Sequence, residues 1–440
     1  MQLKNKTHAI RSQALSFVAD PFIAGQDSAV EYISDALIVM ENGKVSAFGA
    51  YDKLKSFLPA ETEIKSYKDS LVLPGFIDAH VHYPQTQIIG AYGKQLIDWL
   101  NDYTFIAEQQ FKNPDYAKSV AKFFLEECLK AGTTTMMTYC TVFPESVDAF
   151  FEVALEKKMR VIAGKVLMDR NAPLNLLDQS AKAGYDQSKG LIKKWSGTGR
   201  LDYAITPRFA PTSSETQLEL AGALWKEHPE SYMQSHLSEN LGEIAWVKDL
   251  FPKQKDYLDV YDHYGLLGKR AVYGHGIHLS EREWQRLHET QTCIAHCPTS
   301  NQFLGSGLFN FQQAKKSGRE VNIALATDVG AGTSLSQLQS MNESYKIAQL
   351  GGFALSSIHA FYLATRGAAI ALDLDDKIGS IRPGMEADLL VLDLKSTPLI
   401  DFRMKHCKTI EEALFIQMTM GDDRATKAVY VGGELAYSKA

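Results

Sequence analysis

Two absences limit the kind of protein that this 440-residue sequence can encode. It has only five cysteines, an odd and scattered set, so no disulfide framework is indicated and a reducing compartment is expected. It has no apolar run long enough to span a bilayer, and its N-terminal segment is charged, without the uninterrupted apolar core of a secretory signal. We therefore expect a cytoplasmic protein that does not act in a membrane.

An excess of basic charge and a phosphate-binding loop are also missing. The 46 basic residues are outnumbered by 52 acidic ones, and the net charge of −6 does not suggest a nucleic-acid partner. No predicted strand is followed by the glycine-rich turn that binds the phosphates of nucleotides. What remains, 45% hydrophobic and 22% charged residues, is typical of a globular enzyme. The length is sufficient for a large barrel and a second unit.

The middle of the chain alternates between strand-like and helix-like segments. Eight segments have the apolar pattern of strands, the first within 71–85 and the others at 133–139, 160–168, 203–206, 232–236, 271–275, 292–296 and 322–327. Amphipathic helical patterns lie between most of them, at 115–130, 144–158, 215–226 and 281–289. Repeated strand-then-helix units favour a parallel sheet, and eight strands close a (β/α)8 TIM-type barrel. A doubly wound open sheet is the alternative, disfavoured by the missing phosphate loop.

The two ends of the chain have a different pattern of short strands. Residues 36–40 and 45–48 flank an Asn-Gly dipeptide, which is a hairpin signal. Near the C-terminus, residues 387–393 and 428–437 are strand-like as well. We expect residues 1–70 and 378–440 to pair into one small β-sandwich, discontinuous in sequence, while 71–377 form an α/β barrel.

The stretch 71–85, LVLPGFIDAHVHYPQ, carries the first chemical signal. Residues two apart in a strand point to the same face, so His80 and His82 direct two imidazoles toward one point. Neutral imidazole is a ligand for zinc, copper, iron or nickel. Two unrelated loop histidines are the alternative for this pair considered alone.

Further polar residues follow later strands. The fifth predicted strand ends at His236 and continues to Glu239, the sixth ends at His275, and the eighth ends at Asp328. In a barrel these carboxyl ends converge on one face, where active sites lie. Three imidazoles and one carboxylate match a mononuclear catalytic metal with one position open for water.

Each of these residues also has a structural alternative. His236 and His275 can be packed core histidines, and Glu239 and Asp328 can be helix-terminal acids. Their common position at strand ends favours a metal role for His236 and an acid or base role for Glu239. We expect surface or packing roles for His263, His278, His288 and His359.

The seventh predicted strand ends at His296, flanked by Cys293 and Cys297. A zinc deaminase of the base-editing type would have H-x-E with P-C-x-x-C, and this chain has no P-C-x-x-C, so that fold is excluded. We interpret both cysteines as structural. The role of His296, structural or functional, stays open.

Several strings of residues resemble a known family. PGFIDAHVH, with His236, His275 and Asp328 later in the chain, resembles the amidohydrolase superfamily. Within it, the chain most resembles the guanine deaminase family, and the strings that carry this resemblance are HYPQ, LMDRNAP, YAITPRFAPTS, SHLSEN, HCPTSNQFLGSGLF and TDVGAGTS. The resemblance covers essentially the whole chain. It implies a (β/α)8 barrel with a small β-sandwich from both termini.

The resemblance also implies an activity and a set of residues. The activity is hydrolytic deamination of guanine to xanthine and ammonia, in purine catabolism or salvage, by a homodimer. One zinc ion per chain is implied at His80, His82, His236 and Asp328, with His275, Glu239 and Asp328 catalytic. The implied substrate-binding residues are His82, Tyr83, Pro84, Gln85, Arg208, Phe209, His236, Glu239 and Asp328.

The metal count and the substrate have alternatives. Two-metal relatives carry a modified lysine at the end of the fourth strand, but this strand ends ITPRFAP, which favours one metal, and we interpret Lys165 on the third strand as structural. Iron is an alternative to zinc as the native metal. Another aminohydrolase of the superfamily, acting on a pyrimidine, an adenosine derivative or a triazine, is the alternative activity. A non-catalytic barrel scaffold is the alternative outside catalysis.

Overall fold

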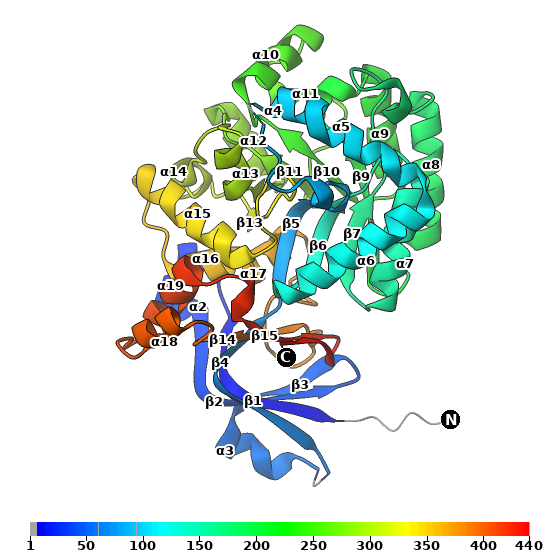
Figure 1. Ribbon diagram of the computed structural model, residues 1–440. Coiled ribbons are helices and arrows are strands. Elements are labelled where there is room, and N and C mark those ends of the chain that lie inside the picture. The colour runs from blue at the N-terminus through cyan, green and yellow to red at the C-terminus, as the bar shows by residue number, and fades with distance from the viewer. Residues whose placement is uncertain (1–6, 60, 94, 440) are drawn as a thin grey trace, which may run out of the picture.

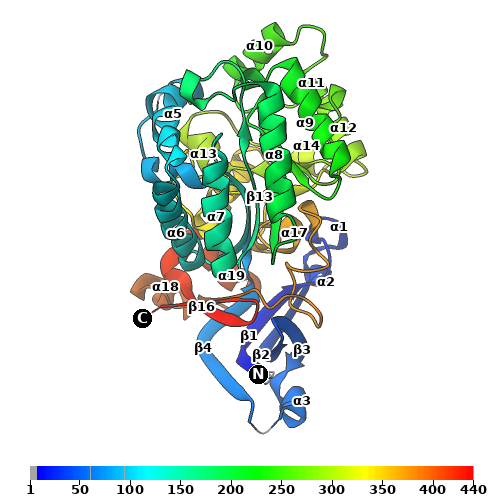
Figure 2. The same cartoon turned by 90° about the vertical axis from the view of Figure 1, so that its right-hand side faces the viewer.

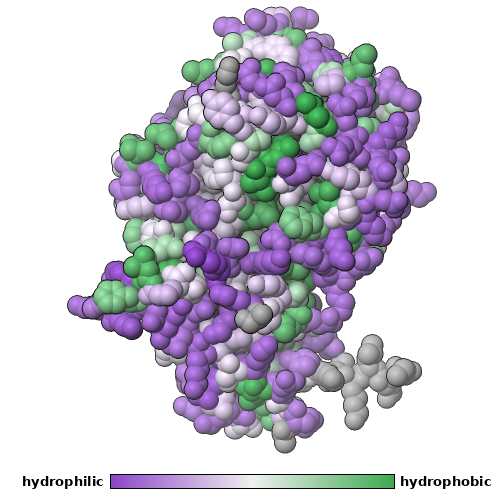
Figure 3. Space-filling view, in the orientation of Figure 1, coloured by the Kyte–Doolittle hydropathy of each residue, from purple (hydrophilic) through white to green (hydrophobic). Residues whose placement is uncertain are grey.

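The computed structural model describes residues 7–59, 61–93 and 95–439. A barrel of parallel strands wrapped by helices lies above a second sheet that both ends of the chain build (Figures 1 and 2). Most of the face drawn in Figure 3 is hydrophilic, with apolar side chains gathered in small areas. Within the described ranges, none of the helices combines the length and apolar character needed to traverse a bilayer. Residues 1–6 of the predicted N-terminal segment lie outside the described residues.

Eight parallel strands form the barrel, which confirms the predicted fold class. They are β5 (Phe76–His82), β6 (Thr133–Tyr139), β7 (Arg160–Gly164), β9 (Leu201–Pro207), β10 (Tyr232–Leu237), β11 (Ala271–His275), β12 (Cys293–His296) and β13 (Ile323–Leu325), with the short β8 (Val166–Leu167) beside β9. The last strand meets the first. Asp328 N donates to His80 O at 2.9 Å, and His82 N donates to Val329 O at 2.8 Å. These two bonds bring the carboxyl ends of β5 and β13 together.

The strands are apolar on both faces because both faces are covered. Small and β-branched side chains fill the barrel interior. One buried cluster there contains Ile77, Ile162, Ala204, Val272 and Ala324. The opposite faces of the strands pack against the surrounding helices in the main core. This two-sided burial explains why the strand segments read as continuous apolar runs rather than as an alternating pattern.

The helices predicted at 115–130, 144–158, 215–226 and 281–289 are confirmed as α6 (Pro114–Lys130), α7 (Pro144–Glu156), α9 (Glu215–Glu227) and α12 (Glu281–Thr290). Side-chain caps define several N-termini, as where Ser214 accepts a bond from Gln217 N. A further long helix between β8 and β9, α8 (Ala181–Trp195), was not predicted. Gly184 and Gly190 weaken its helical signal, whereas its buried face, with Leu191 and Trp195, stabilises it through tertiary packing.

The remaining helices are shorter or lie in the second half of the chain. They are α1 (Pro21–Ala24), α2 (Gln26–Ala29), α3 (Tyr51–Leu54), α4 (Leu96–Trp99), α5 (Phe105–Glu108), α10 (Leu241–Leu250), α11 (Tyr257–His263), α13 (Pro298–Phe303), α14 (Phe311–Ala314), α15 (Gln337–Leu350), α16 (Ser357–Leu363), α17 (Arg366–Ala371), α18 (Pro398–Met404) and α19 (Ile410–Met420).

The second sheet combines strands from both ends of the chain, as predicted. Its order is β16 (Glu434–Ser438), β15 (Thr426–Val431), β14 (Leu389–Asp393), β4 (Glu63–Pro74), β1 (His8–Phe17), β2 (Val30–Glu41) and β3 (Lys44–Ala50). All neighbours are antiparallel except the parallel pair β1 and β4. Asn42 and Gly43 both have positive φ in the predicted β2–β3 hairpin, a conformation that favours these two residue types. The sheet curls, since Ala387 N donates to Gly43 O at 2.8 Å.

The boundary between the two sheets differs from the expected position at Leu71. Leu71 to Pro74 belong to β4, where Leu73 pairs with Leu390 of β14, and the barrel begins at Phe76. Gly75 separates the two strands, and a Cβ there would lie 2.2 Å from Thr134 Oγ1. Two consecutive apolar runs read as one strand, but the Pro-Gly break directs them into different sheets. The division into separately folding domains stays a prediction.

Buried ion pairs join the second sheet to the barrel end opposite the strands' carboxyl termini. Arg200, just before β9, donates through Nη1 to Asp388 Oδ1 at 2.9 Å. The same Asp388 oxygen accepts from Gly432 N at 2.7 Å. Arg160, at the start of β7, donates through Nε to Glu386 Oε2 at 3.1 Å. Charge pairing therefore fixes how the sheet built from the termini docks under the barrel.

The Asp388→Asn variant tests this docking. It removes the charge of the buried carboxylate that Arg200 bonds, whereas Glu386 Oε2 stays 3.3 Å from Arg200 Nε. We therefore expect the free energy of unfolding, measured by urea denaturation, to fall by about 2 kcal/mol. Asp35→Asn is the control, because Asp35 pairs with Arg11 at the surface with 49% of its side chain exposed, and such pairs contribute less than about 1 kcal/mol. Equal effects of the two variants would contradict the role assigned to Asp388.

Candidate active site

Most of the polar residues at the carboxyl ends of the strands line one cavity. One part of its wall carries ionisable groups, and another carries hydrogen-bonding and apolar side chains. The lining residues are His82, Gln85, Leu96, Trp99, Leu100, Arg208, Phe209, His236, Glu239, Glu243, His275, Ser300, Leu304, Asp328 and Ala331. The cavity lies at the face of the barrel where parallel (β/α)8 enzymes place their active sites.

Three imidazoles and one carboxylate converge beside this cavity. His80 and His82 come from the end of β5, His236 from β10, and Asp328 from the segment after β13. His82 Nε2 lies 3.3 Å from both His80 Nε2 and His236 Nε2. Asp328 Oδ1 lies 3.3 Å from the Nε2 atoms of His80 and His82. All four ligand atoms lie within 4.8 Å of one another.

This spacing fits a single metal ion. Ligand atoms about 2.1 Å from a central ion at tetrahedral angles lie about 3.4 Å apart, close to the observed separations. His236 Nδ1–H donates to Arg208 O at 2.6 Å, so its Nε2 presents a lone pair to the common point. A carbonyl that fixes the tautomer in this way is the usual support for a histidine ligand. The four side chains therefore form a group able to bind a metal.

The protonation states favour a cation at this point. Burial lowers the pKa of His82 to about 3 and that of His236 well below its usual value, so both imidazoles are neutral. Burial by itself raises the pKa of Asp328, but the hydrogen bonds from His80 and His82 and the charge of His80 outweigh it and hold this pKa well below the usual range. Neutral nitrogen lone pairs beside an ionised carboxylate are the ligand states that a divalent metal requires.

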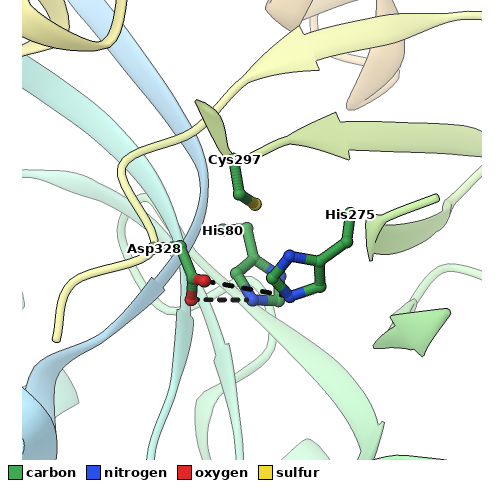
Figure 4. A group of neighbouring side chains, drawn as sticks. All are labelled: His80, His275, Cys297 and Asp328. Atoms are coloured by element: carbon green, nitrogen blue, oxygen red, sulfur yellow. Dashed lines mark ion pairs between the residues drawn. The ribbon is translucent and has the colours of Figure 1, made fainter. Parts of the chain in front are cut away.

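A second combination of potential ligands shares this site. His80, His275, Cys297 and Asp328 also lie within 4.8 Å of one another, and Figure 4 shows the Cys297 side chain near His80 and Asp328. Burial raises the pKa of the Cys297 thiol well above its usual value, and the thiol donates to Ala295 O at 3.3 Å. A neutral thiol is a poor ligand, since metals bind the thiolate. The set with three imidazoles therefore fits a metal better.

Glu239 and His275 lie next to the metal-binding group. His275 Nε2 is 3.4 Å from Glu239 Oε2 and 3.8 Å from Asp328 Oδ2. Asn301 Oδ1 lies 2.8 Å from His275 Nδ1, so this ring edge carries the proton, and Ser306 Oγ donates to Glu239 Oε1 at 3.1 Å. Burial, with a smaller contribution from the Asp328 charge, raises the pKa of Glu239 to about 8. Glu239 is therefore protonated at neutral pH and able to act as an acid.

Arg208 and Gln85 provide hydrogen bonds on another part of the wall. Both side chains are buried, with exposed fractions of 3% and 2%. Phe209 packs edge-on against Trp246, and it lines the cavity with Leu96 and Trp99. Apolar and aromatic wall residues with a few fixed donors and acceptors suit a heterocyclic ligand.

The structure does not bring every predicted site residue to the cavity. Tyr83 and Pro84 are buried but do not line it, and the Tyr83 hydroxyl donates to Ser146 O at 2.6 Å. His296, whose role the sequence left open, lies 3.1 Å from Ser344 Oγ through Nε2 and packs against Phe309. These contacts lie outside the cavity wall and indicate a packing role for His296.

The other predicted structural residues have partners of their own. Lys165 forms a buried ion pair with Asp178 and also donates to Val166 O at 3.1 Å. His278 Nε2–H donates to Ser306 O at 2.8 Å, which positions the residue that bonds Glu239. His278 therefore packs as expected, although it lies closer to the site than its sequence position indicated.

Several residues that shape the site were missed from the sequence. Asn301 and Ser306 lie within the string HCPTSNQFLGSGLF, and that string was the only signal that could have found them. Asp78 is buried and accepts from Thr327 N at 3.0 Å, so it ties the ends of β5 and β13 together. Glu108 is buried beside Arg208 and Gln85, and nothing in its local sequence distinguishes it.

Comparisons with known proteins identify the family of this chain. The model of the amidohydrolase family matches residues 71–436. The guanine deaminase of Escherichia coli (strain K12) is 49% identical over 94% of this chain and 93% of its own length. A solved structure of E. coli guanine deaminase matches with a TM-score of 0.95 at 45% identity, covering 99% of this chain and all of that one. A structure from C. acetobutylicum, described as guanine deaminase with bound guanine in the active site, matches with a TM-score of 0.86 at 30% identity over 98% of this chain and 100% of the other. The chain therefore belongs to the amidohydrolase family and, within it, to the guanine deaminases.

Proposed function

We propose that this chain hydrolyses guanine to xanthine and ammonia at the cavity described above, with one zinc ion held by His80, His82, His236 and Asp328. One observation carries the proposal. His82, His236 and Asp328 of the metal-binding group line a single cavity with the protonated Glu239 and with the donors of Arg208 and Gln85. The relatives that are named guanine deaminases support the same substrate.

The reaction needs a nucleophile, because C2 of guanine is a poor electrophile. A zinc ion held by the four side chains would act as a Lewis acid and lower the pKa of water toward about 7, which makes hydroxide available at neutral pH. Asp328 Oδ2 faces His275 Nε2 at 3.8 Å. This carboxylate is placed to accept the proton that the attacking water loses. With its proton on Nδ1, His275 is placed to accept a hydrogen bond from the attacking water through Nε2.

Glu239 supplies the complementary acid. As oxygen attacks C2, Glu239 donates its proton to ring N3, and the tetrahedral centre at C2 forms. The exocyclic amine then takes a second proton, either the one that Asp328 accepted from water or the C2 hydroxyl proton passed on through Glu239. The C2–N bond breaks, ammonia leaves and the C2 carbonyl forms, and the other of these two protons returns Glu239 to its acid form. Burial keeps the pKa of Glu239 high enough, at about 8, for this first proton transfer.

Substrate selection follows from the hydrogen-bonding edge of the purine. Guanine presents O6 as an acceptor and N1–H as a donor, whereas adenine presents an amine at C6. Arg208 has only donors and is matched to O6, and the Gln85 amide has both an acceptor and donors for the adjoining N1–H. Phe209, His82 and the carboxylates complete the proposed substrate contacts. With adenine bound, Arg208 would face a donor and remain unpaired, which penalises that base.

Metal identity, oligomeric state and location complete the proposal. Histidine and carboxylate ligands suit zinc, with iron as the alternative.

We also propose a homodimer in the cytoplasm. Exposed Leu399 and Phe402 on α18 are apolar side chains that a partner subunit could cover. Light scattering after size-exclusion chromatography measures the dimer, and cell fractionation measures the location.

The assay that tests the whole proposal is ammonia release by the purified protein, with guanine compared with adenine, cytosine, guanosine and a triazine. Guanine-selective release with xanthine as product is expected. Release from another member of the panel would indicate the alternative aminohydrolase. Absence of turnover with every compound by a metal-loaded protein would favour the scaffold alternative.

Glu239→Gln tests the acid. The amide keeps the shape of the side chain but cannot deliver a proton, so we expect kcat on guanine to fall by about 10²–10⁴-fold or more with the metal content unchanged. Glu152→Gln, which alters a surface glutamate paired with Lys118, is the matched control and should retain full activity. Substantial turnover by Glu239→Gln would exclude the proton transfer assigned to it.

Arg208→Ala tests substrate recognition. Loss of the guanidinium removes the donor for O6, and we expect kcat/KM for guanine to fall by more than about tenfold while metal stays bound. The surface variant Arg286→Ala, which loses ion pairs with Asp262 and Glu289 far from the cavity, serves as the control. Unchanged catalytic efficiency of Arg208→Ala would remove this residue from the substrate site.

Metal removal tests the metal-binding group directly. We expect elemental analysis to find about one metal per chain, and dialysis against a chelator to abolish activity that added zinc restores. His236→Ala should lose the bound metal because it removes one of the four proposed ligand atoms. Cys297→Ala should keep the metal. The opposite pattern for these two variants would favour the thiol-containing set of ligands.

A further inference from the structure

We propose that Glu108, a buried residue outside the cavity wall, is a positioning residue that sets the orientation of both Arg208 and Gln85 and thereby determines how well guanine is bound. The inference rests on the function proposed above. It concerns a side chain that does not line the cavity, so Glu108 acts through its two neighbours rather than on the substrate.

The two carboxylate oxygens of Glu108 have separate partners. Arg208 Nη1 donates to Oε2 at 2.7 Å, and Gln85 Nε2 donates to Oε1 at 3.2 Å. Glu108 is 1% exposed, so water cannot replace either bond. One carboxylate therefore links the two side chains that carry the hydrogen-bonding groups of the substrate wall.

Glu108 also determines which way the Gln85 amide faces. An ionised carboxylate only accepts hydrogen bonds, so the amide must turn its NH₂ group toward Glu108. On its other side, Gly330 N donates to Gln85 Oε1 at 3.2 Å, and a backbone N–H only donates. The two neighbours thus require the same orientation of the amide. The unused lone pair on Oε1 and the second N–H are left in fixed positions for a ligand.

The helix that carries Glu108 fixes Arg208 by a second contact. Phe105, at the start of α5, has its ring centre 5.5 Å from Arg208 Cζ, within the range of a cation–π contact. The segment just before α5 contributes Leu96, Trp99 and Leu100 to the cavity wall. Residues 96–108 therefore both cover the cavity and hold the guanidinium. Displacement of this segment would disturb Arg208 as well.

Glutamine at position 108 would disrupt this arrangement without a large change in volume. If its oxygen accepts from Arg208, its NH₂ group faces Gln85, which must then rotate and place its own NH₂ against the N–H of Gly330. If its oxygen faces Gln85 instead, its NH₂ group opposes the Arg208 guanidinium. Either orientation leaves two donors in opposition within a buried space, which the wild-type carboxylate avoids.

The experiment compares steady-state kinetics on guanine for the zinc-loaded wild type, Glu108→Gln, Arg208→Ala and the double variant. Glu108 touches no reacting atom, so we expect Glu108→Gln to raise KM by about tenfold or more, with a smaller change in kcat and unchanged metal content. Because part of the effect of Glu108 passes through Arg208, the loss in the double variant should be smaller than the product of the two single losses.

A matched control separates positioning from stability. Asp178→Asn breaks another buried ion pair, with Lys165, that does not line the cavity. It should lower Tm without raising KM. If Glu108→Gln does not fold, Glu108→Asp replaces it, since the shorter carboxylate cannot reach both partners and should also raise KM.

Two results would overturn the inference. One is a Glu108→Gln protein with wild-type KM and a reduced kcat or Tm, the pattern of a purely structural residue. The other is a loss in the double variant equal to the product of the single losses. Guanine turnover by the wild type, measured first, tests the proposed function independently, so a failure of that function is distinguishable from a failure of the role of Glu108.

Discussion

The pairing between the end of β5 and the segment after β13 is the contact on which the site depends. Asp328 N donates to His80 O and His82 N donates to Val329 O, and these bonds place the carboxylate beside both imidazoles. Asp78 strengthens the same junction through Thr327 N. Barrel closure therefore also assembles the metal-binding group. Its members lie up to about 250 positions apart in the chain and come together only when the first and last strands meet.

Burial has opposite consequences for the two kinds of ionisable group in the cavity. It keeps His82 and His236 neutral and so preserves the lone pairs that a metal needs. It keeps Glu239 protonated by raising its pKa to about 8. Asp328 is the exception, because the adjacent imidazoles stabilise its ionised form. The same buried site therefore holds two neutral imidazoles, one protonated glutamate and one ionised aspartate. These are the protonation states that hydrolytic deamination uses.

Much of the fold and part of the site could be predicted from the sequence. The strands at 133–139 and 271–275 have the predicted limits, because β-branched, apolar and aromatic residues that favour buried strands fill most of both segments. The convergence of His80, His82, His236 and Asp328 followed from their places at strand ends in a barrel. The barrel was predicted to start at Leu71, but it starts at Phe76. Local apolarity does not reveal which of two sheets a strand joins. Helix α8 was missed because its stability comes from packing rather than from propensity.

The sequence by itself determined the residue types, their spacing along each strand, and hence the barrel and its metal-binding group. Those properties are local, set by side-chain alternation and by the positions of polar residues at strand ends. Only the tertiary structure decided which buried polar groups became partners. Glu108 bonds Arg208, 100 positions away, and Tyr83 bonds Ser146 rather than entering the cavity. Such pairings depend on how separate elements pack in space, and a hydrogen bond between distant segments leaves no periodic signal in the chain.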